Sequence, residues 1–264
     1  MNVSPDMQPT AFEYSVEAYN TATESTNRMH DDEVAKTFGF RGGLVPGVDV
    51  WAYMTRPCVD RWGTDFLTGG TMSARLAAPV YDGEVVEARL DPDGTLTLSG
   101  PDGSVRASGS ASLDDLPDVL TIEATPENSS SESPPAATQE NLQTGTVLGT
   151  LRFTYRRSPA SDYLRDIRET SSIYQSGSVC HPGFLARQAN YVLSRHVQLG
   201  PWIHVSTTAH HRSLVNDGDQ LEVRGLVTDE FERKGHRFVD LAVEITANGI
   251  PAWSAVHTAI WKPR

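Results

Sequence analysis

The chain of 264 residues is long enough for one large domain or two small ones. Its mean hydropathy of -0.36 is ordinary for a globular protein, and its net charge of -12 argues against nonspecific binding to nucleic acid. No run approaches the roughly 20 apolar residues of a membrane span, and the N-terminus lacks the features of a signal peptide. Cys58 and Cys180 are too few for a disulfide framework or a cysteine-based zinc site. We therefore expect a cytoplasmic protein that binds neither metal, membrane nor nucleic acid.

The charge is divided unevenly along the chain. Residues 147–264 carry 14 Lys and Arg against 11 Asp and Glu, a net of +3, whereas the remainder carries 8 against 23, a net of -15. The second half is therefore the better candidate for binding a phosphate-bearing ligand. Scattered surface arginines would explain the same numbers.

The first half begins with a weak strand pattern at residues 12–16, followed by a polar loop over residues 20–29. Asp31 has the character of an N-cap, because Asp32 and Glu33 follow it and favour the positive end of a helix dipole. Gly39 is a typical helix stop. A short acidic helix is therefore expected between Asp31 and Gly39.

A second, longer helix is predicted from Gly47 to Gly63. Pro57 lies inside it and should kink it or restart it, because proline cannot donate to the helical hydrogen-bond ladder. Short alternating runs separated by Asp-Gly turns then predict an antiparallel meander. Its expected strands are residues 71–79, 85–90, 95–98 and 104–113.

Residues 118–146 lose all periodicity, and the Ser- and Pro-rich stretch within them is typical of a flexible linker. The second half then repeats the order of the first. A strand is expected at residues 151–155, a loop with a short helix at 158–174, and a long helix that opens at His181-Pro182-Gly183 and ends before Gly200. Three strands follow at residues 220–227, 236–246 and 252–261.

Two pairs of matching segments indicate an internal duplication. Pro46-Gly47 matches Pro182-Gly183 at an offset of 136, and the segment 82–87 matches 217–222 at an offset of 135. Near-equal offsets at two independent features are hard to obtain by chance. We predict an α+β tandem, in which each unit packs one long helix on an antiparallel sheet. The expected boundaries are 1–117 for the first unit, 118–146 for the linker and 147–264 for the second.

The first half also carries a motif. A polar loop presents Asn27 and His30, a short acidic helix contains Ala35, Gly39-Phe40 follows it, and Pro46-Gly47 opens the long helix. This order resembles the MaoC-like or R-specific enoyl-CoA hydratase family in its double-hotdog form. The pattern of that family is Asp-x-Asn-Pro-x-His, a short acidic helix, Gly-Phe and a glycine that opens the central helix. The segment 79–84 resembles the strand and turn that follow that helix in the family.

The resemblance implies a tandem, or double, hotdog fold and an activity. Such enzymes add water to, or remove it from, a 2-enoyl or 3-hydroxyacyl thioester. By position, His30 is the acid/base group, Asn27 the orienting amide, and the backbone N–H near Gly47 the donor that polarises the thioester carbonyl. Gly43, Val45, Gly47 and His181 are the expected substrate-binding residues. Coenzyme A or phosphopantetheine enters as part of the substrate, and no separate cofactor is expected.

The chain departs from the family pattern at two positions. Ser25 stands where the aspartate belongs, so Ser25 can at most hold a water, and either Glu24 or Asp31 could supply a carboxylate instead. Pro46 replaces the histidine that usually precedes the last glycine. Two further hypotheses therefore stand beside the hydratase: a non-catalytic acyl-thioester binding protein, and a thioesterase on the same scaffold.

Other histidines offer weaker signals. Cys180-His181 is better explained as a structural turn, because adjacent residues rarely face each other as a thiolate–imidazole pair. His210-His211 lies on a predicted strand, where neighbours point to opposite faces and cannot jointly hold a metal. The expected partner is an acyl thioester on coenzyme A or an acyl carrier protein. The chain is expected to be either a monomer that acts as a pseudo-dimer or a homo-oligomer.

Overall fold

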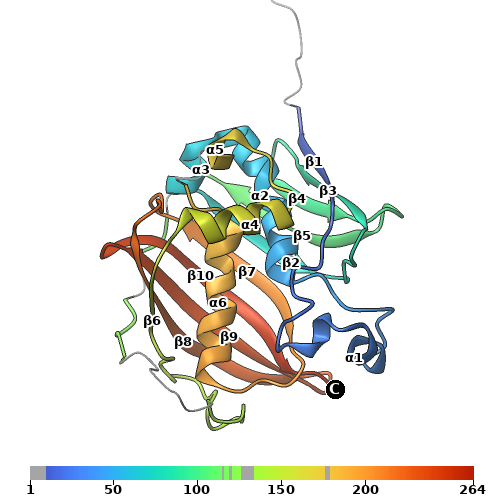
Figure 1. Ribbon diagram of the computed structural model, residues 1–264, viewed down its shortest axis with the longest axis vertical. Coiled ribbons are helices and arrows are strands. Elements are labelled where there is room, and N and C mark those ends of the chain that lie inside the picture. Colours follow the sequence, from blue (N-terminus) through green and yellow to red (C-terminus); the bar gives the residue numbers. More distant parts are fainter. Residues whose placement is uncertain (1–9, 115, 119–120, 126–133, 176–178) are drawn as a thin grey trace, which may run out of the picture.

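The computed structural model describes residues 10–114, 116–118, 121–125, 134–175 and 179–264. The ten strands of the described residues form one antiparallel sheet, in the order β1-β3-β4-β5-β2-β7-β10-β9-β8-β6 (Figure 1). The strands are β1 Phe12–Glu17, β2 Thr71–Leu76, β3 Val85–Leu90, β4 Thr95–Ser99, β5 Val105–Ser112, β6 Leu151–Thr154, β7 Ile203–His211, β8 Gln220–Arg233, β9 His236–Ala247 and β10 Ile250–Lys262. The helices are η1 Arg28–His30, α1 Asp32–Thr37, α2 Gly47–Trp62, α3 Thr64–Gly69, α4 Arg157–Asp166, α5 Ser172–Gln175 and α6 Pro182–His196.

The strand order is a palindrome of the two halves, centred on the pair β2 and β7. In this ladder Ser73 lies opposite Thr208, and these residues are 208 − 73 = 135 positions apart. That separation equals an offset between the matching segments of the sequence, so the Ser73–Thr208 pair marks a pseudo-two-fold axis. The predicted α+β class and the internal duplication are thereby confirmed.

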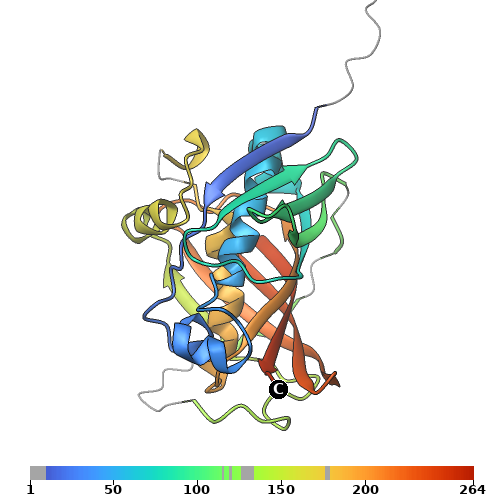
Figure 2. The same cartoon turned by 90° about the vertical axis from the view of Figure 1, so that its right-hand side faces the viewer.

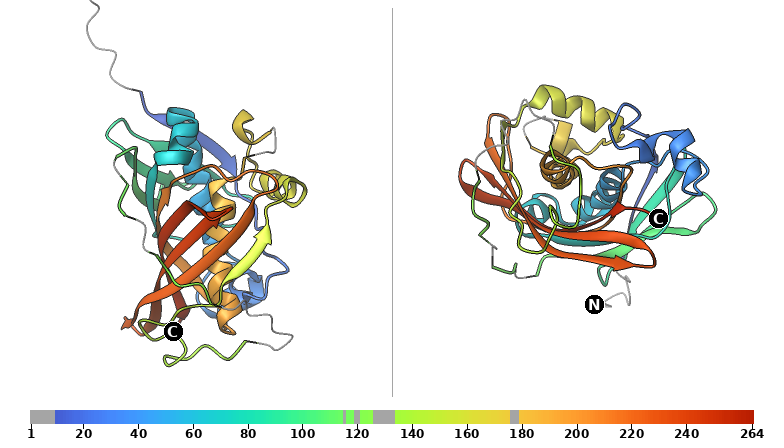
Figure 3. Two further views of the ribbon diagram at one scale, coloured as in Figure 1. Left: turned by 90° about the vertical axis from the view of Figure 1, so that its left-hand side faces the viewer. Right: turned by 90° about the horizontal axis from the view of Figure 1, so that it is seen from below.

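The two long helices lie side by side on the concave face of the curved sheet (Figure 3). Most of α2 is buried, including Trp51, Tyr53 and Met54, because the sheet covers one side of it and α6 covers another. Between the helices, Arg187 of α6 contacts the fully buried Asp49 of α2 through two guanidinium nitrogens. This pairing satisfies a charge that would be costly to bury alone.

The duplicated turns have the same geometry in both halves. Gly83 and Gly218 both have a positive φ, of 74° and 97°, which glycine adopts without strain. Just after each glycine, a carboxylate accepts from a backbone N–H three residues earlier: Glu84 from Tyr81, and Asp219 from Asn216. The sequence match at an offset of 135 therefore reflects one repeated turn.

Several expectations for the local structure need correction. Helix α2 runs through Pro57 as a single element and ends at Trp62 with Gly63 as its C-cap, so the predicted restart at Pro57 is wrong. The segment 158–174 forms two helices, α4 and α5, where one short helix was expected. Helix α6 ends at His196, earlier than the expected stop before Gly200.

The expected linker lies partly outside the described residues, which leave out 119–120 and 126–133. Its described parts are packed against the second half. Ile122 and Leu142 are buried, the Thr125 backbone N–H donates to the Thr150 hydroxyl, and Ala137 donates to the carbonyl of Gln198. The domain boundaries themselves stay a prediction. Within the described residues, no helix is long and apolar enough to cross a membrane.

Candidate active site

His30 ends the short helix η1 in a loop that folds over the end at which α2 begins (Figure 2). Its Nδ1 lies 2.7 Å from the carbonyl oxygen of Leu44. Because a carbonyl only accepts, Nδ1 must carry the proton, and the neutral ring then has its lone pair on Nε2. Gly43 permits this arrangement, since a Cβ there would overlap the backbone carbonyl of His30.

Asn27 holds the other side of the imidazole. Its Nδ2 lies 3.3 Å from His30 Nε2 and also donates to the Trp202 carbonyl at 3.0 Å. Its Oδ1 accepts from the backbone N–H groups of Met29 and Trp202. The amide is therefore fixed in orientation, and it fits the role of orienting group that the motif implies.

The protonation state of His30 follows from its surroundings. Burial lowers the pKa of His30, while the hydrogen bond to Leu44 and the charge of Asp49 oppose this and Arg187 adds to it. The net result is that the pKa of His30 lies below its ordinary value of 6.5. At neutral pH the ring is therefore uncharged, and Nε2 is available as a base.

His30 lines a cavity of about 270 Å³ with mainly apolar walls. Gly47 lines the same cavity and begins the 16-residue helix α2. Its N-cap residue is Pro46, which makes no side-chain cap. The N–H of Asp49 donates to the Pro46 carbonyl, so the N–H groups of Gly47 and Val48 are the donors that this helix start leaves free. The other residues lining the cavity include Met29, Phe40, Leu44, Val45, Val50, Leu76, Val80, Asn190, Trp202 and Ile203.

His204 of β7 is a cavity residue that the sequence did not single out. It packs so closely on the start of α2 that a Cβ on Gly47 would lie 2.7 Å from its Nδ1. The Thr207 hydroxyl lies 2.8 Å from both His204 Nε2 and His257 Nδ1 and joins the two buried rings. Burial lowers the pKa of His204 to about 4, although nearby backbone groups of Ser206 and Gly47 oppose this. His204 is thus a neutral wall residue beside the helix start.

Among the residues that the structure describes, no candidate carboxylate makes a hydrogen bond or ion pair with the ring of His30. Glu24 and Ser25 are exposed and line a second hollow, of about 360 Å³, which shares His30 and Asn27 with the first. The Ser25 hydroxyl accepts from the backbone N–H of Asn27. Asp31 caps α1 by accepting from Glu33 and Val34 and pairs with Arg28. Asp31 therefore has a helix-capping role, and Glu24 and Ser25 are the candidates that share a hollow with His30.

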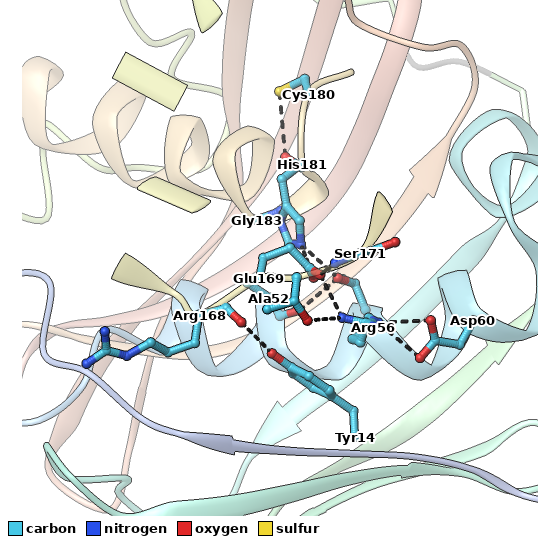
Figure 4. Close-up of polar contacts among 12 residues, drawn as sticks. Tyr14, Ala52, Arg56, Asp60, Arg168, Glu169, Ser171, Cys180, His181 and Gly183 are labelled. Atoms are coloured by element: carbon cyan, nitrogen blue, oxygen red, sulfur yellow. Dashed lines mark hydrogen bonds and ion pairs between the residues drawn. The ribbon is translucent and has the colours of Figure 1, made fainter. Parts of the chain in front are cut away.

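Of the four expected substrate-binding residues, two line the cavity and two do not. Val45 and Gly47 line the cavity, whereas the N–H of Gly43 donates to Asp32. His181 lies elsewhere, buried at the start of α6 (Figure 4). Its Nδ1 accepts from the N–H of Gly183, and its Nε2 lies 3.4 Å from Glu169, which also pairs with Arg56.

This second helix start is the pseudo-symmetric counterpart of the first, but it is filled. A Cβ on Gly183 would overlap the hydroxyl of Tyr163, and Tyr174 lies against His181 with ring centroids 4.7 Å apart. Tyr163, Tyr174, Glu169 and His181 line none of the hollows described here. The two halves thus present one open and one filled helix start.

No family model matches the sequence, and no curated protein matches it. Solved structures match over almost the whole chain. A putative MaoC domain protein dehydratase from Chloroflexus aurantiacus J-10-fl has 11% identity and a TM-score of 0.65, with 97% of this chain and 95% of that chain covered. RV0216 from Mycobacterium tuberculosis, described as a double hotdog fold, has 12% identity, a TM-score of 0.65 and 95% coverage of both chains. The chain has a double hotdog fold.

The double-hotdog neighbours are not confined to dehydratases. A putative thioesterase from Novosphingobium aromaticivorans DSM 12444 has 13% identity and a TM-score of 0.54, with 95% of this chain and 96% of that chain covered. At such identities the similarity establishes the fold alone. The predicted fold is confirmed, and the neighbours that carry it include the MaoC-like proteins that the motif resembles.

Proposed function

We propose that this protein is a hydratase or dehydratase that acts on a 2-enoyl or 3-hydroxyacyl thioester. The observation that carries the proposal is the position of His30. Its imidazole carries a lone pair on Nε2, which faces the Asn27 amide nitrogen at 3.3 Å, and it lines the same apolar cavity as the start of α2. A base and an anion-stabilising helix start beside one apolar cavity are the parts that proton transfer next to a thioester carbonyl requires.

In the hydration direction, His30 Nε2 removes a proton from water while the water oxygen bonds to the β-carbon. Electrons of the double bond shift toward the carbonyl oxygen, and the N–H of Gly47 stabilises the resulting enolate. The imidazolium then returns the proton to the α-carbon, so that the product is the substrate plus one water. Dehydration reverses these steps, with His30 taking the α-proton and protonating the departing hydroxyl.

This one-base scheme fits a site in which Ser25 replaces the family aspartate. No carboxylate lies within hydrogen-bond distance of His30 in the described residues, so the imidazole both takes and returns the proton. Its lowered pKa supports the second step, because a more acidic imidazolium returns its proton more readily. Asn27 keeps the ring in place, and the attacking water would take the position at Nε2 that the Asn27 amide nitrogen contacts.

A thioesterase is the second candidate, and the structural similarity to two putative thioesterases favours it. The same base and helix start could direct water to the carbonyl carbon, where it would release a free thiol. A protein that binds acyl thioesters without turnover is the third. The three candidates differ in their products, so one experiment separates them.

The test supplies the purified protein with a panel of 2-enoyl and 3-hydroxyacyl thioesters of coenzyme A. Enoyl absorbance and free thiol are followed together, in the wild type and in His30→Gln. A hydratase changes the absorbance without releasing thiol, and His30→Gln lowers turnover at least about 100-fold. Thr23→Ala is the control from the same loop, because Thr23 is exposed and lines neither hollow, and turnover should stay within about threefold of wild type. Thiol release would establish a thioesterase instead, and ligand-induced stabilisation without turnover a binding protein.

A further inference from the structure

The convex face of the sheet carries a hollow of about 250 Å³ beside the mouth of the His30 cavity. Three residues, Arg75, Val205 and Phe238, line both, so the two spaces adjoin. The remaining residues that line this outer hollow are Ser206, Phe231, Arg233, Lys234, His236, Asp240 and Thr258.

The two spaces adjoin where the central strands part. Strands β2 and β7 pair from Thr71 and His210 as far as Arg75 and Ser206. The next residues along β2 and the preceding residues of β7 line the cavity instead, as Leu76 and Ile203 do. Arg75 alternates with the buried Met72 and Ala74 and therefore points to the convex face. A ligand can extend from His30 on the concave side to Arg75 on the outside.

Positive charge gathers around this opening. Arg75, Arg233 and Lys234 are exposed, and no hydrogen bond or ion pair joins their side chains to any residue that the structure describes. Asp240 is the single acidic residue lining the hollow, and it accepts from the Thr258 hydroxyl. Most other arginines of this acidic chain are paired, as Arg237 is with Glu230. Three unpaired cations at one hollow indicate an anionic ligand.

The hollow also has an aromatic floor. Phe231 and Phe238 stack with ring centroids 5.0 Å apart and an angle of 2° between the planes, and both are only partly buried. Aromatic side chains beside cations suit a nucleotide, because the base stacks on a ring while its phosphates meet Arg and Lys. A phosphate on a carrier protein would use the cations but not the aromatic floor.

We propose that this hollow binds the phosphorylated adenosine end of coenzyme A, with the pantetheine arm passing between β2 and β7 to His30. The inference rests on the proposed function in one respect, that the ligand is an acyl thioester. It adds the carrier group of the thioester, which is coenzyme A, and the residues that recognise that group. The Arg233-Lys234 pair lies at the turn between β8 and β9, where Lys234 has a φ of 54°.

The test is calorimetric and needs no turnover. Coenzyme A, 4′-phosphopantetheine and pantetheine are titrated into the wild type and into the double variant Arg233→Gln/Lys234→Asn. Asparagine tolerates the left-handed conformation of Lys234, so the turn is kept while the charge is lost. The control is Arg157→Gln/Arg165→Gln, which removes two exposed charges from α4. Melting temperatures confirm that both variants fold.

We expect the Kd of coenzyme A to rise at least about tenfold in the hollow variant and to change less than about twofold in the control. Pantetheine and 4′-phosphopantetheine should bind equally to all three proteins. An equal loss for 4′-phosphopantetheine would overturn the assignment in favour of a carrier-protein phosphate. Unchanged coenzyme A affinity, or none in the wild type, would overturn it outright. Charge-dependent binding without any turnover would leave this inference standing while the proposed reaction fails.

Discussion

Asn27 and Trp202 exchange two hydrogen bonds although 175 residues separate them in the chain. Asn27 Nδ2 donates to the Trp202 carbonyl at 3.0 Å, and the Trp202 N–H donates to Asn27 Oδ1 at 3.1 Å. The loop that carries His30 is thus attached to the second half of the chain at the residue that orients its imidazole. The loop of His30 in the first half therefore depends on the second half for its position.

Replacing Asn27 with aspartate tests this attachment. The carboxylate can still accept from Trp202, but it loses the donor to the Trp202 carbonyl and places a negative charge against that oxygen. We expect the free energy of unfolding to fall by about 1–3 kcal/mol, with turnover reduced at least about tenfold. Chemical denaturation and the enoyl assay measure both. Asn27→Asp with wild-type stability would show that the exchange contributes nothing.

The pH dependence of turnover reports on His30. Its pKa lies below 6.5 because burial disfavours the imidazolium. The neutral base is lost as the pH falls, so kcat/KM should be flat at neutral pH and decline on the acid side with a midpoint below 6.5. The measurement is a pH profile of kcat/KM for the hydration direction, because kcat/KM reports the pKa of the free protein. A midpoint above 7 would mean that another group limits the rate.

Adding one methyl group at the start of α2 tests the cavity. In Gly47→Ala the new Cβ would lie 2.5 Å from Leu76 Cδ1 and 2.7 Å from His204 Nδ1. We expect kcat/KM to fall at least about 30-fold, because the donor N–H and the bound carbonyl are pushed apart. Gly69→Ala is the matched control, since nothing lies within 4 Å of its Cβ. Equal activity of the two variants would show that Gly47 is not part of the site.

His181 provides the opposite case. It caps α6 and lies against Glu169, away from the cavity of His30. His181→Ala should therefore lower the free energy of unfolding by about 1–3 kcal/mol, by removing the cap and a partner of a buried carboxylate. Turnover per folded molecule should stay within about threefold of wild type. A loss comparable to that of His30→Gln would place His181 in the chemistry.

Local features were predictable because short-range chemistry determines them. Asp31 caps α1 as its sequence context indicates, and the backbone turns at Gly39 with a φ of 85°. The duplication was visible because Pro46-Gly47 and Pro182-Gly183 both open a long helix. The restart of α2 that was predicted at Pro57 does not occur, since packing on nearly every side of the helix compensates for one missing hydrogen bond.

The rest of the site depends on contacts between distant segments. His204 reaches Gly47 only because β7 pairs with β2, and the alternation of residues 203–211 cannot reveal which strand is adjacent. The same applies to Tyr163, whose hydroxyl occupies the space at Gly183. The surplus of positive charge in residues 147–264 can be counted in the sequence, but the sequence could not show that Arg233 and Lys234 line one hollow with Arg75.

The filled helix start at Gly183 bears on how the two halves of the chain could diverge in evolution. In a homodimer built on this axis, every substitution appears twice, so a tyrosine that closes one helix start would close the other as well. Covalent fusion of the two copies removes that constraint. Tyr163 and Tyr174 could then accumulate on one side as hydrophobic filling while the other side kept its opening. The asymmetry between Gly47 and Gly183 is a freedom that a duplicated and fused gene has and a homodimer lacks.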